Sequence, residues 1–359
     1  MLRRIFALAS IAFAVSLLSS TGAMATAQRT FVSGTGDDLN VCTLVAPCRS
    51  FSRALTQTND SGEIIVIDSA GYGVVTIDKS VSIVAPAGVY AGISVFPGAD
   101  GVVIAGAGIE VALRGLTING QGGNRGIFYT FGARLRVSHC EISKMSGAGI
   151  ALNFGGEVLI EDSLIRENGS HGIHIALNPN VIVMRTTIDA SGGDGIYFHP
   201  SAGDARLDVT ASTLARNTAS GIHVFPNNVM ATLSLAHSTI GQNLTGVLLA
   251  SSDTAAPVVA FLNGNTIVHS LNGINVVSNG NLGDLSVAAV DNLVSDHSSA
   301  GIQVAGTGAR AVLDRNTITH NFRGVSRLVN AVIETRSNNT VRENGTDTTG
   351  TPYTPVGGV

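Results

Sequence analysis

The chain is poor in charged side chains, which make up 13% of its 359 residues, and it has no tryptophan and only 2 lysines beside 19 arginines. The net charge is −4 and the arginines form no basic cluster. This argues against nucleic acid as a partner, because nucleic-acid binding depends on massed contacts between cations and phosphates. Low charge, with Gly, Asn, Ser and Thr between short apolar runs, favours an all-β solenoid over a disordered chain.

Hydrophobic runs that could span a membrane are absent beyond the N-terminus, since none reaches ~20 apolar residues. The N-terminus itself has the features of a secretory signal peptide, predicted as residues 1–25. The basic pair Arg3-Arg4 precedes an apolar region at residues 5–18, and Ala23-Met24-Ala25 forms a cleavage site, with a second possible cut after Ala27. We expect an exported protein, periplasmic or extracellular, with no membrane span in the mature chain. The export route stays open.

A glycine followed by Ile or Val recurs through most of the chain at intervals of 23 to 28 residues. A near-constant period of this length marks a stacked array in which one structural unit repeats along an axis. Between the glycines, apolar and polar residues alternate in short pieces, which is the pattern of β-strands. The repeated glycines are Gly126, Gly149, Gly172, Gly195, Gly221, Gly246, Gly273, Gly301 and Gly324.

This pattern predicts an all-β fold, a single-stranded right-handed parallel β-helix with coils of about 23 to 28 residues over residues 63–345. We expect Gly and Asn to supply positive φ at the corners. Residues 26–62 are predicted to form an N-terminal segment with a short cap helix, in which Ser50 is the N-cap and Phe51 faces the core. Residues 346–359 are polar and rich in Gly and Pro, and a flexible tail is predicted there.

Cysteine is scarce, with three residues in the chain. Cys42 and Cys48 are close enough to close a small loop, and an oxidising compartment would let them pair, so we predict a disulfide between them. Cys140 falls at the repeat position where other coils place small residues, and we interpret it as a buried, inert thiol. The small residues at that position are Ser163, Thr186, Ser212 and Ser238.

A family resemblance is carried by residues 29–38, 42–51 and 62–67 and by the Ser-x-Ile, Asn and Gly-Ile positions of the coils. These resemble the N-terminal segment and the repeats of bacterial pectin-lyase-like proteins. The resemblance covers residues 29–345 and implies a right-handed parallel β-helix. It implies no single activity, because that superfamily contains lyases, hydrolases, esterases, epimerases, phage tailspikes and non-catalytic surface proteins.

The catalytic motifs of that superfamily are missing. Ser170-His171-Gly172 resembles the His-Gly element of polygalacturonase-like hydrolases, but no Asn-Thr-Asp, no Asp-Asp within the coils and no Arg-Ile-Lys accompanies it. Nor do three carboxylates share equivalent positions in adjacent coils, as a calcium site of the pectate-lyase kind would require. We therefore expect no metal and no cofactor, and whether the protein is an enzyme stays open.

The register of the repeat brings together side chains from different coils, because equivalent residues of adjacent coils lie ~4.8 Å apart. Two positions matter, the residue before the repeated glycine and the outward residue after the following Ile. In three neighbouring coils these positions carry titratable and aromatic side chains. The predicted patch consists of His171, His174, Asp194, Tyr197 and His223, with His199 nearby.

Three interpretations of this patch stay open. The simplest is that His and Tyr are tolerated on an exposed strand. In the second, the patch is a sugar-binding groove. In the third, His171 beside Asp194 serves as an acid–base pair for catalysis. The candidate ligand-binding residues are His174, Tyr197, His199 and His223.

The leading functional hypothesis is an exported, carbohydrate-interacting β-helix protein with a polysaccharide as its partner. An uncharacterised polysaccharide lyase or glycoside hydrolase is the first alternative. A non-catalytic structural or adhesive surface protein is the second. The sequence indicates neither the glycan nor the oligomeric state.

Overall fold

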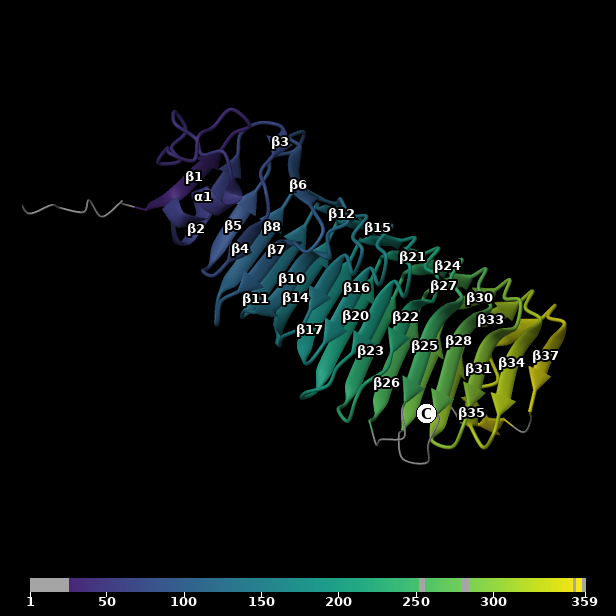
Figure 1. Cartoon of the computed structure of the whole chain (residues 1–359). Helices are drawn as coiled ribbons and strands as arrows, with labels where there is room; N and C mark the ends of the chain where they lie inside the picture. The colour runs from purple at the N-terminus through teal and green to yellow at the C-terminus, as the bar shows by residue number, and fades with distance from the viewer. Residues whose placement is uncertain (1–25, 252–255, 279–283, 351–352, 357–359) are drawn as a thin grey trace, which may run out of the picture.

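The computed structural model describes residues 26–251, 256–278, 284–350 and 353–356. The predicted signal peptide, residues 1–25, lies outside the described residues. The described chain winds into a parallel β-helix whose three sheets run the length of the molecule (Figure 1). This confirms the predicted all-β solenoid. Every pairing between strands is parallel, as the near-constant repeat requires.

Sheets A, B and C are named in the order in which each coil visits them. Sheet A contains β1 (Ala27–Val32), β2 (Thr58–Val66), β5 (Val81–Val84), β8 (Glu110–Arg114), β11 (Arg134–Ser138), β14 (Gly156–Glu161), β17 (Pro179–Met184), β20 (Ala205–Thr210), β23 (Ala231–Ala236), β26 (Val258–Asn263), β29 (Leu285–Val290), β32 (Ala309–Asp314), β35 (Val332–Thr335) and β38 (Thr354–Pro355). Sheet B contains β3 (Ala70–Gly71), β6 (Ala91–Val95), β9 (Leu116–Gly120), β12 (Glu141–Ser143), β15 (Leu164–Arg166), β18 (Thr187–Asp189), β21 (Thr213–Ala215), β24 (Thr239–Gly241), β27 (Thr266–Val268), β30 (Leu293–Ser295), β33 (Thr317–Thr319) and β36 (Thr340–Arg342). Sheet C contains β4 (Val75–Ile77), β7 (Asp100–Ala105), β10 (Arg125–Phe131), β13 (Ile150–Leu152), β16 (Ile173–Ala176), β19 (Ile196–His199), β22 (Ser220–Val224), β25 (Thr245–Ser251), β28 (Asn272–Ser278), β31 (Ala300–Ala305), β34 (Arg323–Leu328) and β37 (Thr346–Thr349).

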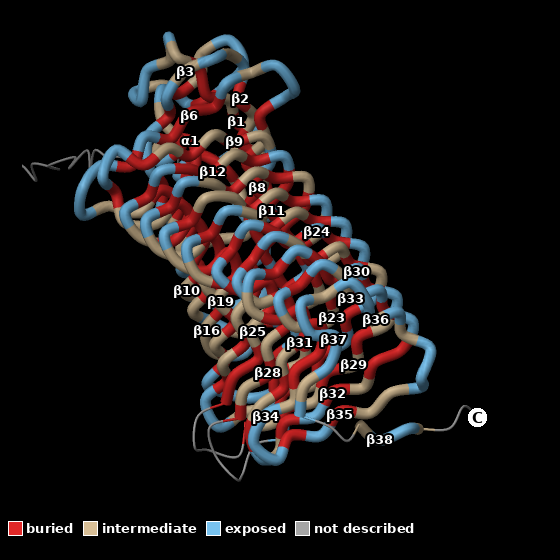
Figure 2. Tube along the Cα trace, turned by 90° about the vertical axis from the view of Figure 1, so that its right-hand side faces the viewer, coloured by how far each residue is buried: buried red, intermediate tan, exposed pale blue. Residues whose placement is uncertain are grey.

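The core is a set of aliphatic columns along the axis, one residue from each coil. Ile173, Ile196 and Ile222 follow the repeated glycine in three successive coils, pair in register and are fully buried. Buried residues recur in every coil, as the red segments of the tube show (Figure 2). Because successive side chains of a strand point to opposite faces, the residue after each of these isoleucines faces outward on sheet C.

The repeated glycines are required by close packing. None of them has left-handed φ. A Cβ atom at Gly246 would lie 2.5 Å from the carbonyl oxygen of Gly273 and 2.6 Å from Cγ2 of Ile267. A Cβ atom at Gly221 would lie 2.7 Å from the carbonyl oxygen of Gly246. The coils therefore approach one another along this column more closely than any side chain permits.

Glycine and asparagine supply left-handed φ at some corners, Gly264 among them, but other residues do so more often, so the prediction for the corners is correct only in part. Asp162 (φ 49°) and Arg185 (φ 47°) occupy the corner between sheets A and B in adjacent coils, and Glu167 (φ 55°) occupies a corner between sheets B and C. Left-handed φ costs an L-residue roughly 1–2 kcal/mol. The parallel ladders on both sides offset this cost, since the backbone N–H of Asp162 donates to Met184 O at 3.2 Å in the next coil.

Polar side chains stack inside the corners as ladders. The backbone N–H of Asn217 donates to Oδ1 of Asn243 at 2.9 Å, and Nδ2 of Asn243 donates to Leu214 O at 3.0 Å. Cys140 belongs to a second ladder, in which its backbone N–H donates to Oγ of Ser163 at 3.1 Å. Its thiol is buried, and burial raises its pKa to about 11. The predicted buried thiol is confirmed.

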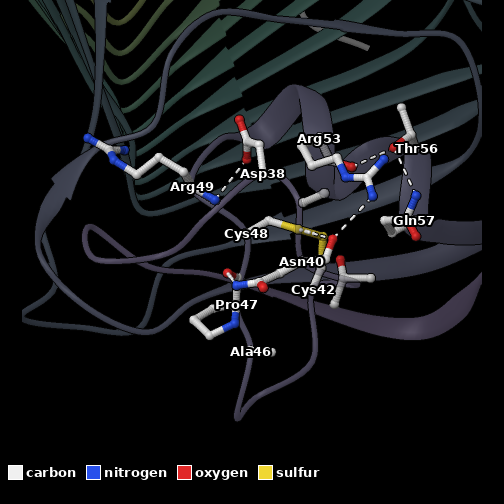
Figure 3. Close-up of a disulfide and its surroundings, with 12 residues drawn as sticks. Asp38, Asn40, Cys42, Ala46, Pro47, Cys48, Arg49, Arg53, Thr56 and Gln57 are labelled. Carbon is white, nitrogen blue, oxygen red and sulfur yellow. Dashed lines mark hydrogen bonds between the residues drawn. A yellow bond between two sulfur atoms is a disulfide. The ribbon is translucent and has the colours of Figure 1, made fainter.

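The N-terminal end of the solenoid is covered by helix α1 (Phe51–Gln57), which packs against β1, β2 and β4. Ser50 is its N-cap and accepts a hydrogen bond from the Arg53 backbone N–H, as predicted. The disulfide between Cys42 and Cys48 is present, with Cα atoms 4.6 Å apart, and closes the loop that precedes the helix (Figure 3). Among the described residues no helix is long and apolar enough to cross a membrane.

The C-terminal end differs from the predicted flexible tail. Residues 346–349 form β37, which pairs with β34, and Thr354 and Pro355 pair with β35. The hydroxyl of Tyr353 donates to Val325 O at 2.9 Å, and its ring packs against the end of the core. Polar composition is compatible with a strand here because all four residues of β37 are exposed or half-buried.

Candidate functional site

The residues of the predicted patch lie side by side on the outer face of sheet C. His174 of β16 pairs in register with Tyr197 of β19, and Tyr197 pairs with His223 of β22. His199 continues β19 two residues beyond Tyr197. The repeat period therefore predicted the register correctly, because each side chain recurs one coil later on the same face.

Tyr197 lies at the centre of a cluster of rings. Its ring centroid is 4.8 Å from that of His171, 5.4 Å from His174 and 5.1 Å from His223. It also stacks on His199, with centroids 5.4 Å apart and ring planes only 6° apart. Offset stacking at such distances is favourable. We call these five rings, together with Phe225, the ring cluster.

Phe225 is a member that sequence reasoning missed. Its ring centroid is 5.7 Å from that of His199 and 5.9 Å from that of His223. The Nδ1 atom of His199 also makes a hydrogen bond with Phe225 O. The signal was present in the register, because Phe225 follows His223 by two residues, as His199 follows Tyr197. Phe225 could therefore have been predicted by including the second outward residue of each sheet C strand.

Asp194 lies beneath the rings with its side chain only 6% exposed. Its Oδ1 accepts a hydrogen bond from the Ser220 backbone N–H at 2.8 Å. Its Oδ2 is 3.4 Å from Nδ1 of His223 and 3.5 Å from Nδ1 of His171. However, Nδ1 of His171 accepts a hydrogen bond from the Asp194 backbone N–H at 3.1 Å. That nitrogen therefore carries no proton, and His223 is the imidazole that donates to the carboxylate.

The surroundings shift the pKa values of several members. Burial would raise the pKa of Asp194, but the hydrogen bonds from His223 and Ser220 and the charges of His223 and His171 lower it below its usual value. Burial lowers the pKa of His174 to about 4, with the neighbouring imidazoles adding to the effect. Burial also lowers the pKa of His171, although Asp194 opposes it. At neutral pH Asp194 is thus a carboxylate, and His171 and His174 are neutral.

The partners of Asp194 set it apart from other buried carboxylates. Glu161, with a side chain 10% exposed, is paired with Arg136 and Arg185, and Asp314 is paired with Arg315. Asp194 has imidazoles and a backbone N–H as its partners instead. A buried carboxylate without a permanent cation is costly. Such residues with shifted pKa values are concentrated at functional sites.

A groove of about 560 Å³ lies on sheet A, away from the ring cluster, over an apolar floor that includes Leu159 and Ile182. Its arginines are already paired within the protein. Arg134 lies 2.9 Å from Glu157, Arg136 lies 2.5 Å from Glu161 and Arg206 lies 2.7 Å from Asp208. Because these charges satisfy one another, the groove is a weaker candidate than the ring cluster.

The remaining chemistry of the site is proton transfer and hydrogen bonding. Within residues 26–251, 256–278, 284–350 and 353–356, no group of three or more His, Cys, Asp or Glu side chains is arranged to hold a metal ion. The contact between Asp194 and His223 has the form of a carboxylate that orients an imidazole, an arrangement used for acid–base chemistry. The rings around Tyr197 offer a half-buried aromatic surface for packing.

Comparison with known proteins gives one family match, over part of the chain. The family model for the right-handed beta helix region matches residues 100–260, which include β16, β19 and β22. No curated protein matches the chain in sequence. Among solved structures, pectate lyase Pel9A is similar, with a TM-score of 0.53 and 14% identity over 89% of this chain and 80% of that one.

Two further solved structures have the same TM-score of 0.53. The catalytic domain of a GH87 alpha-1,3-glucanase variant in complex with nigerose is 12% identical and covers 81% of this chain and 67% of its own. The Dettilon tailspike protein is 13% identical and covers 88% of this chain and 68% of its own. Identities this low show the fold alone. With three parallel sheets, stacked polar ladders and the match to the right-handed beta helix model over residues 100–260, the chain has the fold of a right-handed parallel β-helix and is similar in fold to the pectate lyase.

Proposed function

We propose that this protein binds a carbohydrate on the outer face of sheet C, at the ring cluster. The observation that carries the proposal is the ring of Tyr197, which is held by imidazoles from three successive coils and is half-buried in the sheet face. Sugars present apolar C–H faces that pack on aromatic rings, and their hydroxyl groups bond to polar side chains at the rim. Neutral imidazoles suit this purpose, since each has one N–H donor and one acceptor nitrogen.

The similar structures support the proposal in a general way. They are a pectate lyase, a glucanase in complex with nigerose and a tailspike protein. Export belongs to the same proposal. It is supported by the signal-like N-terminal sequence and by the bond between Cys42 and Cys48, because disulfides persist mainly in oxidising compartments.

The test is a glycan-binding panel with the purified protein and two single variants. Tyr197→Ala removes the central ring and should abolish binding. Asn275→Ala changes the same outward position of sheet C two coils beyond His223 and should leave binding unchanged. Circular dichroism would check that both variants keep the fold. Binding that survives in Tyr197→Ala would contradict this site, and a parent protein that binds no glycan would leave the structural or adhesive surface protein as the function.

A second candidate function, polysaccharide lyase or glycoside hydrolase, is favoured by the contact between Asp194 and His223. A carboxylate that orients an imidazole could move a proton to or from a bound glycan. A lyase would release unsaturated products that absorb in the ultraviolet, and a hydrolase would release new reducing ends. Either activity should be lost in His223→Gln while glycan binding persists. Glycans that bind without either product would leave binding as the function.

A further inference from the structure

We propose that the ring cluster takes an uncharged glycan and discriminates against uronates and other anionic polysaccharides. This inference rests on the carbohydrate binding proposed above and names the class of sugar that the same site accepts.

The charge at the site is negative. Asp194 lies beneath the rings of His171 and His223, and its side chain is 6% exposed. Burial and neighbouring imidazoles keep His174 neutral at pH 7, with a pKa lowered to about 4. A carboxylate in a partly desolvated setting interacts with nearby charges more strongly than one in water. A uronate lying on Tyr197 would bring a second negative charge close to the carboxylate of Asp194.

The nearest cation along the outward face of sheet C, Arg125, already pairs with a carboxylate of the protein. Arg125 of β10 donates from Nε to Asp100 Oδ1 at 2.8 Å and from Nη2 to Asp100 Oδ2 at 3.1 Å. Its guanidinium also lies over the ring of Phe128, 3.5 Å from the centroid. This double engagement holds the arginine three coils before Tyr197. Arg125 is therefore too far away to neutralise a uronate bound at the ring cluster.

Anionic sugars also pay a larger desolvation free energy on binding than neutral sugars do. A carboxylate that leaves water needs charged or multiple hydrogen-bond donors to offset its desolvation. His171 and His174, whose pKa values burial lowers, are neutral at pH 7 and each supply a single N–H group. Sugar hydroxyls need no such compensation, because each can both donate and accept.

The extent of the cluster indicates the size of the ligand. His174, Tyr197 and His223 occupy three adjacent coils, which span roughly 10 Å at the spacing of neighbouring strands. A surface of this length fits a short oligosaccharide that lies across the strands, with its central unit on Tyr197. Affinity for an uncharged glycan series should therefore rise with length and then level off.

The test compares length-matched xylo-oligosaccharides, oligogalacturonates and chitosan oligomers by calorimetry at pH 7 and low ionic strength, where exposed charges are least screened. We expect the uncharged series to bind at least about tenfold more tightly than the uronate series, as two unneutralised like charges require. Leu248→Arg places a cation at the same outward position one coil beyond His223. It should strengthen uronate binding about threefold, as expected of an exposed charge pair, and leave xylo-oligosaccharide binding unchanged.

The outcomes separate the two proposals. If none of the three series, and no other glycan, binds the folded parent protein, the carbohydrate function itself fails. If uronates bind the parent as tightly as the uncharged series or more tightly, or if only the partly protonated chitosan series binds, carbohydrate binding stands and the charge selectivity proposed here is wrong. An unchanged uronate affinity in Leu248→Arg would also contradict the electrostatic argument.

Discussion

Oδ2 of Asp194 lies 3.4 Å from Nδ1 of His223, one coil further along the solenoid, and this contact joins a buried carboxylate to a half-buried imidazole of the ring cluster. The backbone N–H of Ser220 fixes the other carboxylate oxygen at 2.8 Å. The carboxylate is thereby oriented from two sides. His171 lies equally near but accepts a hydrogen bond through the facing nitrogen, so the two histidines play different parts.

The charge of Asp194 should control the titration of its neighbours. Asp194→Asn keeps an oxygen for the Ser220 N–H and removes the charge, so the protein should stay folded. The pKa of His171 should fall further, because Asp194 opposes the lowering caused by burial. The pKa of Tyr197, which burial and Asp194 both raise, should move back toward its usual value. Histidine titration by NMR and tyrosinate absorbance would measure these shifts.

Asp208→Asn is the matched control for that titration. Asp208 is a carboxylate on sheet A whose partner, 2.7 Å away, is Arg206. Neutralising it should leave the pKa values of His171 and Tyr197 unchanged. If the two aspartate variants shift these values equally, the effect is a general one of net charge and the proximity of Asp194 to the rings does not determine it.

Close packing of the coils should make the repeated glycines intolerant of any side chain. In Gly246→Ala the added Cβ would meet the carbonyl oxygen of Gly273 at 2.5 Å, and a backbone oxygen within a ladder cannot easily move away. We expect a loss of about 1–3 kcal/mol in the free energy of unfolding, as for other overpacked cores. Denaturant-induced unfolding followed by circular dichroism would measure it.

Gly71→Ala provides the comparison for this glycine. Its Cβ would meet only Gly92 O, at 3.8 Å, which is an ordinary contact. Its effect should stay within about 0.5 kcal/mol, as for most surface substitutions. Equal losses in the two variants would mean that close approach of the coils is not what makes the repeated glycine necessary.

Much of the fold and of the site followed from the spacing of the glycines alone. A near-constant period fixes which residues are neighbours in a solenoid, so the pairing of His174 with Tyr197 and of Tyr197 with His223 could be predicted without any structure. The period could not tell which histidine donates to Asp194. That depends on a backbone N–H reaching Nδ1 of His171, a detail of corner geometry that the repeat does not encode.

Other errors came from treating local composition as decisive. Asp162 and Arg185 adopt left-handed φ because the ladders on either side impose it, although both residue types disfavour it in isolation. Residues 346–349 are polar, yet they form a strand because β34 offers an edge with unpaired backbone groups. In both places the neighbouring coil determines the conformation, and its influence is invisible in a short window of sequence.

The three cysteines should differ in reactivity as the structure places them. Burial raises the pKa of the Cys140 thiol to about 11, so little thiolate forms at neutral pH and reagents cannot reach it. The native protein should therefore show no thiol that reacts with a chromogenic disulfide reagent. Unfolding should expose one thiol, and unfolding with reduction should expose three, since Cys42 and Cys48 are paired. Two or more reactive thiols without reduction would contradict the disulfide.

A histidine in one of the polar ladders should make the solenoid sensitive to acid. His297 is buried and takes the place that asparagine holds in other coils. Its Nδ1 accepts from the Ser270 backbone N–H at 3.2 Å, and its Nε2 donates to Ile267 O at 3.0 Å. These are the hydrogen bonds that Oδ1 and Nδ2 of an asparagine would make. The imidazole therefore acts as a neutral substitute for an amide.

Burial lowers the pKa of His297, although the carbonyls of Ile267 and Ser270 and the charge of Asp296 oppose the shift. A histidine whose folded pKa lies below its unfolded value of about 6.5 binds protons more readily in the unfolded chain. Its contribution to stability is thus complete above pH 6.5 and is lost as the pH falls below that value toward the folded pKa. His297→Asn should keep the ladder at pH 7 and weaken the loss of stability between pH 7 and 5.

The comparison that isolates this effect uses unfolding midpoints of the parent and two variants across that pH range. His320→Asn changes an exposed histidine near Glu343 and should leave the pH dependence close to that of the parent. His297→Ala should lower stability by about 1–3 kcal/mol at every pH, because the Ser270 N–H is left buried without an acceptor. If His297→Asn loses stability in acid as steeply as the parent does, protonation of this ladder position is not what destabilises the solenoid.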